Sequence, residues 1–365
     1  MKIVHVVDSM EVGGAEVLVS QMCRMQRDQG HDPHVLAVAA LGVLGEQMLT
    51  EGFEVTASVG RHLVDSAVRF FKIFRKLKPD VVHLHNPTPT MYAGPAARMA
   101  GVPAIVSTRH SLVAAPHNPI MERKYRIAAR FCDWVVGICD ATAENLRQIE
   151  SAKPAKIIRV YNGALSIPSV PLERRVETVG FTLLYVGRLH PIKNHPMMLR
   201  AFHEARKMAP ELRLWMVGDG SERASLEALA SDLKITQYVK FWGQQVDVAP
   251  FYLSADAFMM SSVSEGLPIS LLQAFSVGLP AIVTNVGGMA EVVQLAGAGE
   301  IVPLSDVDTM ALAIDRIATN ATIREQYSRA GKQAFQKYFT LEKMVISYGE
   351  LYRNTAFMKR SKKSR

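Results

Sequence analysis

The sequence predicts an α/β protein built from two doubly wound parallel sheets. Short runs rich in β-branched residues alternate with helical stretches along most of the 365 residues, and this alternation is typical of parallel sheets. It stops once, over residues 167–180, where proline, charge and loss of periodicity indicate a linker. A chain of this length is also expected to form about two domains. Two sheets joined by one linker account for all three observations.

The first half contains six expected strands, each a short apolar or β-branched run between turn residues. They cover residues 2–7, 35–39, 81–84, 104–107, 134–137 and 156–160. The helical stretches between them include residues 15–27, 68–77 and 119–130. We therefore assign residues 1–166 to a first domain.

The second half repeats the alternation after the linker. Its expected strands cover residues 181–186, 212–217, 238–242, 257–261, 281–284 and 300–302. One helix begins at Asn194 with Pro196 in its first turn, where proline is favoured, and another covers residues 309–317. We assign residues 181–340 to a second domain. Residues 341–354 are expected to form a helix that crosses back to the first domain, so that 341–365 comprise this helix and a basic tail.

Composition limits the class of protein. Hydrophobic residues make up 48% of the chain and charged residues 21%, as in globular proteins. Cys23, Cys132 and Cys139 are too few and too scattered for a disulfide framework or a zinc site, which favours a reducing compartment. The chain begins in a strand without the apolar run of a signal peptide, and its longest apolar run, 35–45, is too short to span a bilayer. We expect a cytoplasmic protein, soluble or peripheral at the inner face of the membrane.

A net charge of +8 is compatible with nucleic acid, an anionic membrane or small anionic molecules as partners. The sequence contains no nucleic-acid motif, so we expect no nucleic-acid partner. The helix at 68–77 (VRFFKIFRKL) and the tail at 359–365 (KRSKKSR) combine basic with aromatic or polar residues. Each is read either as a solvated basic surface or as a contact with anionic lipid.

The most informative segment is residues 261–284, SSVSEGLPISLLQAFSVGLPAIVT. It reads as a strand end, a Gly/Pro loop that carries Glu265, and a helix that ends at Gly278. The N-terminus of a helix presents free N–H groups and the positive end of its dipole, which suits phosphate. Gln273 follows Glu265 by eight positions on this helix. Taken alone, Glu265 would be an ordinary loop acid or cap, and Gln273 an ordinary helix residue.

A second pattern suited to phosphate lies at residues 183–194, LLYVGRLHPIKN. An apolar strand runs into Gly187 and Arg188, and Lys193 follows before the next helix. Arginine can bind two phosphate oxygens at once and lysine adds a compact charge, as a diphosphate requires. An isolated loop cation is usually solvated, but this strand and spacing favour a binding role.

In the first half, polar residues follow several expected strands. Gly13 and Gly14 precede the helix at 15–27, where glycine permits either a close ligand or a plain tight turn. His85 and Asn86 follow the strand at 81–84, and His110 follows the strand at 104–107. These residues lie at carboxyl strand ends, where α/β proteins bind ligands.

Together these segments resemble the family 4 glycosyltransferases of the GT-B fold, which has two Rossmann-like domains facing across a cleft. Residues 265–273 resemble the family's E-x7-E segment, with Gln273 replacing the second acid, and residues 187–193 resemble its G-R-L-x-x-x-K loop. Further matches in family order are GGAE at 13–16, TRH at 108–110, YNGA at 161–164, VGDGSER at 217–223 and GGMAEVV at 287–293.

The resemblance implies a role for each matching residue. The catalytic residues would be His110, Arg188, Lys193 and Glu265. The donor-binding residues would be Gly14, Arg188, Lys193, Gly266, Leu267, Pro268, Ile269 and Gln273. The acceptor-side residues would be Gly13, Gly14, His85, Asn86 and His110. Because glutamine lacks the charge of a carboxylate, the departure at Gln273 bears on donor affinity more than on the fold.

Two other motifs suggest a function that the surrounding sequence does not support. Gly218, Asp219 and Gly220 suggest a dinucleotide fingerprint, but its third glycine is absent, which argues against a dehydrogenase. Asp306 and Asp308 form a D-x-D pattern typical of metal sites, yet they open the helix at 309–317, so we expect a helix cap. We expect neither a metal ion nor another cofactor.

The sequence thus favours a retaining, metal-independent glycosyltransferase. Its donor would be a nucleotide diphosphate sugar, with UDP favoured and GDP next, and its acceptor a hydroxyl of a saccharide or lipid-linked glycan. Two alternatives remain: a non-catalytic nucleotide-sugar-binding protein, which the loss of charge at Gln273 favours, and a GT-B enzyme of the phosphorylase type, for which the chain is short.

Overall fold

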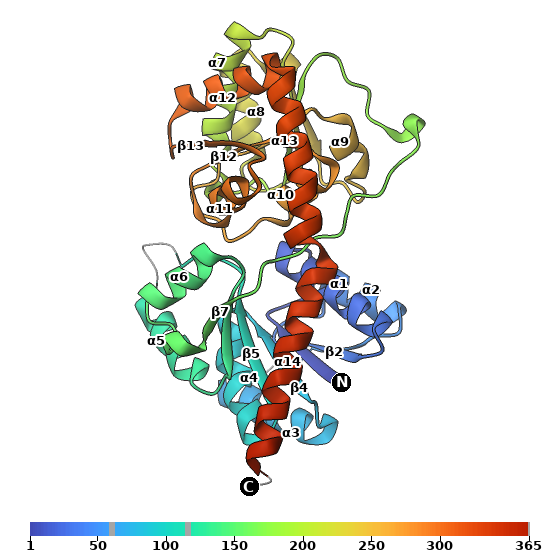
Figure 1. Cartoon of the computed structure of the whole chain (residues 1–365), viewed down its shortest axis with the longest axis vertical. Helices are drawn as coiled ribbons and strands as arrows, with labels where there is room; N and C mark the ends of the chain where they lie inside the picture. The colour runs from blue at the N-terminus through green and yellow to red at the C-terminus, as the bar shows by residue number, and fades with distance from the viewer. Residues whose placement is uncertain (58–62, 114–117, 364–365) are drawn as a thin grey trace. The chain divides into compact units, whose positions relative to one another are not determined.

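The computed structural model describes residues 1–57, 63–113 and 118–363, and the chain divides into two compact units (Figure 1). Unit 1 comprises Met1–Asn162 and Leu341–Arg365, and unit 2 comprises Gly163–Thr340. Residues 167–180, expected as a linker, belong to unit 2. The last two residues of the expected basic tail, 364–365, lie outside the described part of the chain.

Unit 1 is built on one parallel sheet of seven strands in the order β3-β2-β1-β4-β5-β6-β7. The strands are β1 (Lys2–Val7), β2 (Asp32–Ala37), β3 (Glu54–Ala57), β4 (Val81–His85), β5 (Ala104–Arg109), β6 (Trp134–Gly137) and β7 (Ile157–Arg159). Six of them confirm the strands predicted for this half. Strand β3 was not predicted, because it has no apolar run. Its four residues alternate Glu54 and Thr56 with apolar residues, and it lies at the edge of the sheet.

Helices cover the sheet of unit 1, as a parallel sheet requires on both faces. They are α1 (Gly14–Asp28), α2 (Gly42–Thr50), α3 (Leu63–Leu77), α4 (Pro87–Met99), α5 (Pro119–Ala129), α6 (Asp140–Gln148) and α14 (Leu341–Lys363), with a short 3-10 helix at Pro154–Lys156. Phe70 and Phe74 of α3 are fully buried in a core with Leu84 and Ile105 of the sheet. The aromatic side of the helix predicted at 68–77 is therefore core.

The opposite side of α3 leaves Arg69, Lys72, Arg75 and Lys76 exposed. No helix among the described residues is both long and apolar enough to cross a bilayer. Contact with anionic lipid stays a prediction. We expect the protein to co-sediment with anionic vesicles at low salt and to be released at high salt, because salt screens exposed charges.

The double variant Lys72→Ala/Arg75→Ala should weaken this lipid binding, and neutral vesicles serve as the control. Equal binding to neutral and anionic vesicles at low salt would leave α3 as a helix with a solvated basic surface.

Helix α14 completes unit 1 although it follows unit 2 in the sequence. It lies against α1 and β5 (Figure 1). The Trp134 indole donates a hydrogen bond to Thr355 Oγ1 at 2.9 Å, and Lys359 forms an ion pair with Asp133 at 2.6 Å. Polar side chains as well as apolar packing therefore attach the helix to the sheet.

Unit 2 contains a second parallel sheet of six strands in the order β10-β9-β8-β11-β12-β13. The strands are β8 (Thr182–Val186), β9 (Arg213–Val217), β10 (Val239–Gly243), β11 (Ala257–Met260), β12 (Ala281–Thr284) and β13 (Gly299–Val302). All six confirm the predicted strands.

The helices of unit 2 follow its strands in alternation. They are α7 (His195–Met208), α8 (Arg223–Asp232), α9 (Ala249–Ser254), α10 (Ile269–Val277), α11 (Gly287–Ala296), α12 (Val307–Thr319) and α13 (Ala321–Ala334). Short helical turns occur at Leu172–Arg174, Pro191–Lys193, Thr236–Tyr238 and, as a π-helix, Phe335–Phe339. The two-sheet α/β fold predicted from the sequence is confirmed.

Candidate active site

The loop after β8 presents Arg188 at the surface of unit 2. The Tyr185 side chain is fully buried beneath this loop, and its hydroxyl donates to the Arg188 carbonyl oxygen at 3.0 Å. Burial, and secondly the charge of Glu265, raise the pKa of the Tyr185 hydroxyl, so it remains a donor. A Cβ on Gly187 would lie 2.7 Å from that hydroxyl oxygen, which explains the glycine. The backbone of Arg188 is thus fixed while its side chain is exposed.

A second glycine loop packs against the first. The Leu189 backbone N–H donates to the Asp219 carbonyl at 2.9 Å, and Leu189 itself is fully buried. A Cβ on Gly218 would collide with the Gly187 carbonyl, and one on Gly220 with the Leu189 carbonyl. Close packing of these two loops accounts for the Gly-Asp-Gly sequence without a dinucleotide.

Lys193 and Glu265 are paired with each other. Lys193 Nζ donates to Glu265 Oε1, and both side chains are largely buried. The Ser262 hydroxyl donates to the same carboxylate oxygen at 3.0 Å, and the Ser261 hydroxyl donates to the Lys193 carbonyl at 2.9 Å. We call the loop with Arg188 and Lys193 the cation loop, and the loop with Glu265 the acidic loop. Lys193 and Glu265 are 72 positions apart in the sequence, and their contact joins the two loops into one bonded group.

Helix α10 begins directly behind the acidic loop. Pro268 is its N-cap, and none of its described residues in the first turn is acidic. Leu267 is 3% exposed and anchors the loop, while the Gly288 N–H at the start of α11 donates to the Gly266 carbonyl at 2.7 Å. The N-terminus of α10, near Ile269, is therefore held beside Glu265 and Lys193. This arrangement brings a cation close to the positive end of a helix dipole, which suits an anion.

Asp306 is the N-cap of α12, and its carboxylate accepts from the Thr309 N–H at 2.9 Å. The backbone and side-chain hydrogen bonds of Thr309 lower the pKa of Asp306. The predicted helix cap is therefore confirmed for Asp306.

In unit 1, Gly13 is the N-cap of α1 and Gly14 its first residue. A Cβ on Gly14 would meet nothing within 4 Å, so protein packing does not require glycine there. The open space above Gly14 is consistent with the close approach of a ligand to the backbone.

His85, Asn86 and His110 lie together in unit 1. The His110 backbone N–H donates to Asn86 Oδ1 at 3.1 Å, and His85 Nδ1 lies 3.0 Å from His110 Nε2. Asn86 has a φ of 72° and a ψ of 175°, a strained backbone conformation that residues other than glycine rarely adopt. Burial lowers the pKa of His110 to about 4, so its ring is neutral at neutral pH.

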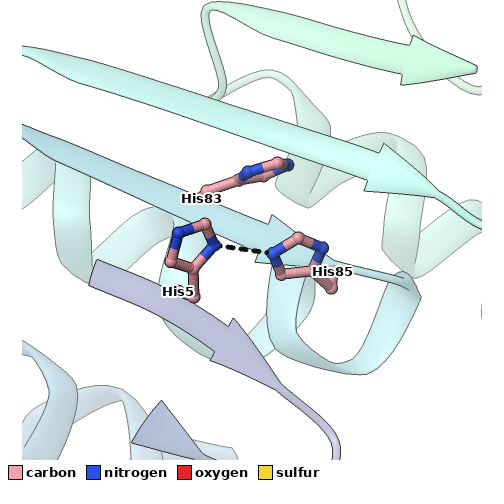
Figure 2. A group of neighbouring side chains, drawn as sticks. All are labelled: His5, His83 and His85. Carbon is pink, nitrogen blue, oxygen red and sulfur yellow. Dashed lines mark hydrogen bonds between the residues drawn. The ribbon is translucent and has the colours of Figure 1, made fainter. Parts of the chain in front are cut away.

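Two further histidines, His5 and His83, lie beside His85 (Figure 2). His5 in β1 is in register with His83 in β4, and both side chains are fully buried. Ring nitrogens of His5, His83 and His85 lie within 4.8 Å of one another, a spacing that a metal ion could use. His5 and His83 were not predicted as site residues. Their position inside strands of otherwise apolar residues could have indicated them.

Two family models match most of the chain. Residues 12–164 match the family described as Glycosyltransferase Family 4, and residues 174–334 match the family described as Glycosyl transferases group 1. The chain belongs to glycosyltransferase family 4. The resemblance of the sequence motifs to this family is thereby confirmed.

Two curated relatives of this family 4 glycosyltransferase have names that specify lipid-linked acceptors. It is 27% identical over 308 residues to the Escherichia coli UDP-Gal:alpha-D-GlcNAc-diphosphoundecaprenol alpha-1,3-galactosyltransferase, covering 79% of this chain and 78% of that protein. It is 26% identical over 344 residues to the Mycobacterium leprae phosphatidyl-myo-inositol mannosyltransferase, covering 89% of each.

The fold of the family 4 glycosyltransferase also matches solved structures. Anabaena Alr3699/HepE, solved in complex with UDP, superposes with a TM-score of 0.85 over 97% of this chain and 100% of that one, at 17% identity. The match supports the GT-B fold that the motifs predicted.

Gln273 lies on α10, two turns beyond Glu265, and its side chain is half-buried. The hydroxyl of Tyr252, on α9, donates to the Ser270 carbonyl at 3.0 Å and lies 3.4 Å from Gln273 Oε1. Among the residues that the structure describes, the Gln273 amide oxygen thus has a long contact with the Tyr252 hydroxyl and no shorter hydrogen bond. A carboxylate there could accept the same hydroxyl and still bind a ligand.

We expect Gln273→Glu to tighten binding of the free nucleotide by about 1 kcal/mol, because a carboxylate accepts hydrogen bonds from ribose hydroxyls more strongly than an amide. Isothermal titration of UDP and GDP into both proteins measures the change. The matched control is Gln294→Glu, the same substitution at an exposed position of α11.

Unchanged affinity in Gln273→Glu would remove Gln273 from the donor site. Weaker binding would mean that the added charge repels the diphosphate, and that the site is built around a neutral side chain.

Proposed function

We propose that this family 4 glycosyltransferase transfers a hexose from a nucleotide diphosphate sugar to a hydroxyl of a saccharide or lipid-linked glycan. We further propose retention of configuration, a UDP-sugar as the first choice of donor and a GDP-sugar as the second. The observation that carries the proposal is the bonded group in unit 2, where Lys193 pairs with Glu265 just before the start of α10, while Arg188 is exposed on the same loop as Lys193.

This group fits the chemistry of a departing diphosphate. Negative charge grows on the leaving oxygens as the glycosidic bond breaks, and fixed cations and N–H groups stabilise it most when they need not move. Tyr185 and Ser261 fix the backbone of the cation loop through side-chain hydrogen bonds. The loop can therefore supply the positive charge that a metal ion supplies in other enzymes, and we propose transfer without a metal ion.

Relatives support the donor and acceptor classes. The E. coli relative is named for a UDP-galactose donor and a diphosphoundecaprenol-linked acceptor, and the M. leprae relative for a phosphatidylinositol acceptor. HepE was solved with UDP. We propose that this enzyme likewise acts at the cytoplasmic face of a membrane, in polysaccharide or cell-envelope biosynthesis, with the basic side of α3 contacting lipid.

A non-catalytic nucleotide-sugar-binding protein is the second candidate, because Gln273 replaces a carboxylate at a donor-binding position. Such a protein would bind donor without consuming it. The bonded group in unit 2 would be the same in either case, so the two functions are separated by turnover.

A panel of UDP- and GDP-sugars tests the proposal. We expect one donor to raise the melting temperature, since a ligand of the folded state stabilises it, and to release nucleoside diphosphate in the presence of a saccharide acceptor. Release should persist in excess chelator, and its loss there, restored by Mg²⁺, would contradict metal independence. Stabilisation without release under any acceptor would favour the binding protein, and no stabilisation by any donor would overturn the proposal.

A further inference from the structure

Unit 1 contains a continuous chain of hydrogen-bonded side chains that ends at His110. We call Gln26, His5, His85 and His110 the histidine chain. Gln26 Oε1 lies 2.8 Å from His5 Nε2, His5 Nδ1 lies 3.0 Å from His85 Nε2 (Figure 2), and His85 Nδ1 lies 3.0 Å from His110 Nε2. The chain runs from α1 through β1 and β4 to the residue that follows β5.

Each ring of the chain carries one proton at neutral pH. Burial lowers the pKa of His5 and of His110 to about 4, and lowers that of His85 well below its usual range. In a neutral imidazole, one nitrogen donates and the other accepts. Two facing nitrogens at 3.0 Å must therefore be one donor and one acceptor, so the tautomer of each ring determines that of the next.

The amide oxygen of Gln26 determines which nitrogen donates in every hydrogen bond of the histidine chain, because this oxygen can only accept a hydrogen bond. His5 then carries its proton on Nε2, and its bare Nδ1 accepts from His85 Nε2–H. By the same reasoning, His85 Nδ1 accepts from His110 Nε2–H. His110 is left with a bare Nδ1, and this nitrogen is buried with no hydrogen-bond partner within the described residues. A buried acceptor without a partner calls for an explanation.

We propose that Gln26, His5 and His85 are positioning residues that hold His110 as its Nε2–H tautomer, with Nδ1 as an acceptor for a hydroxyl of the bound sugar. The link to a sugar rests on the proposed function, whereas the tautomer does not. Reversing the Gln26 amide would reverse every ring and turn His110 Nδ1 into a donor. Gln26, 21 positions from His5 and in another element, would then be a determinant of what His110 can bind.

His83 supports the chain from the side. Its ring lies 4.0 Å from that of His85 between centroids, and its own nitrogens bond to Thr108 Oγ1 at 2.7 Å and to the Tyr352 hydroxyl at 2.6 Å. Tyr348 bonds to Thr108 at 3.0 Å. Two tyrosines of α14 thus hold His83 against the His85 ring.

A metal ion on His5, His83 and His85 is the rival explanation of this cluster. Every ring nitrogen of these three residues already has a hydrogen-bond partner at 2.6–3.0 Å. A metal ion would have to displace at least one partner of each ring, and two of the three rings belong to the histidine chain. The observed contacts favour the chain.

Nuclear magnetic resonance of the full chain with ¹⁵N-labelled histidine tests the tautomers directly. In a neutral ring, protonated and bare nitrogens have well separated ¹⁵N shifts. We expect His5, His85 and His110 each to show a protonated Nε2 and a bare Nδ1 at pH 7. A protonated Nδ1 on His110 would overturn the proposal, as would stoichiometric zinc in the purified protein together with metal-shifted resonances of His5 and His85.

Substitutions at Gln26 test its control of the chain. Gln26→Glu keeps an acceptor beside His5 and should retain the bare Nδ1 of His110. Gln26→Leu removes the acceptor and should give His110 a mixture of tautomers. The matched control is Gln21→Leu on the same helix, where the side-chain oxygen has no partner among the residues described. A single unchanged tautomer in Gln26→Leu, with the fold intact by circular dichroism, would contradict control by Gln26.

The link to a ligand has a separate readout. A bound nucleotide sugar should shift the His110 Nδ1 resonance, and the free nucleotide should shift it much less. If the enzyme turns over while this resonance stays unchanged on donor binding, the role of Nδ1 as the sugar acceptor is wrong. If no donor turns over but the tautomers are as expected, the proposed function fails and the control of His110 stands.

Discussion

Replacing Arg188 with alanine should lower kcat/KM for glycosyl transfer by about 100-fold, equivalent to about 2.7 kcal/mol of transition-state stabilisation. The guanidinium is exposed at the end of a loop whose backbone is fixed by Tyr185, so its removal leaves the packing of unit 2 unchanged. The melting temperature should therefore stay at the wild-type value. Steady-state kinetics with the stabilising donor, together with thermal unfolding, measure both effects.

Lys193→Ala should show a similar kinetic loss, but it also removes an ion-pair partner from the largely buried Glu265. An unpaired buried carboxylate destabilises the fold, so this variant should melt earlier than Arg188→Ala. Arg200→Ala, which removes an exposed cation from α7 of the same unit, is the matched control and should behave as wild type. Near-normal turnover in Arg188→Ala would mean that Arg188 does not stabilise the departing diphosphate.

Acid should unfold unit 1 before unit 2. Burial lowers the pKa of His5 to about 4, while a histidine in the unfolded chain takes up its proton near pH 6.5. Between these two pH values the unfolded state binds more protons than the folded state. The contribution of His5 to the free energy of unfolding is therefore fully present above about pH 6.5 and is lost as the pH falls toward about 4. Each such histidine lowers the free energy of unfolding by about 1.4 kcal/mol per pH unit in this window.

Several other histidines of unit 1 also lower its free energy of unfolding as the pH falls. The pKa values of His83 and His85 are also lowered by burial, and that of His110 to about 4, whereas His195 contributes in unit 2. Asp8, whose pKa burial raises, opposes the trend at lower pH. Among the described residues, unit 1 has four such buried histidines and unit 2 has one. The free energy of unfolding should therefore fall more steeply with acid for unit 1 than for unit 2.

Urea unfolding between pH 7.5 and 5 measures this difference. Fluorine resonances of 5-fluorotryptophan separate the units, because Trp134 lies in unit 1 and Trp215 and Trp242 in unit 2. His5→Phe should reduce the pH slope reported by Trp134 by about one proton. His190→Gln, an exposed position, is the control and should leave the slope unchanged. Parallel pH slopes for all three tryptophans would contradict the prediction.

Most of the fold could be predicted because its signals are local. Each buried strand is a short apolar run, and twelve of the thirteen strands formed by the described residues were predicted. The missing strand, β3, carries Glu54 and Thr56 and depends on its neighbour β2 for pairing. The start of α10 behind Glu265 could also be predicted, since Gly266, Pro268 and the following apolar residues define it locally.

The contacts within the site could not be predicted, because they join distant parts of the sequence. The motifs indicated that Lys193 and Glu265 both lie in the site, but not that they pair with each other. The bond between His83 and Tyr352 joins residues 269 positions apart. Only the alternation in β4, which places His83 and His85 on one face, hinted at the histidine chain. The roles of His110, Glu265 and Gln273 toward substrate stay predictions.

The discontinuity of unit 1 also affects how the protein can be made. During translation, Met1–Asn162 leaves the ribosome before the 178 residues of Gly163–Thr340, and α14 comes only after them. Until α14 arrives, the Trp134 indole and the His83 ring lack their partners Thr355 and Tyr352. Unit 2 is contiguous and can mature first, although its sequence comes second. Unit 1 can therefore be completed only at the end of synthesis, and a fragment meant to represent unit 1 must carry α14, for example by circular permutation.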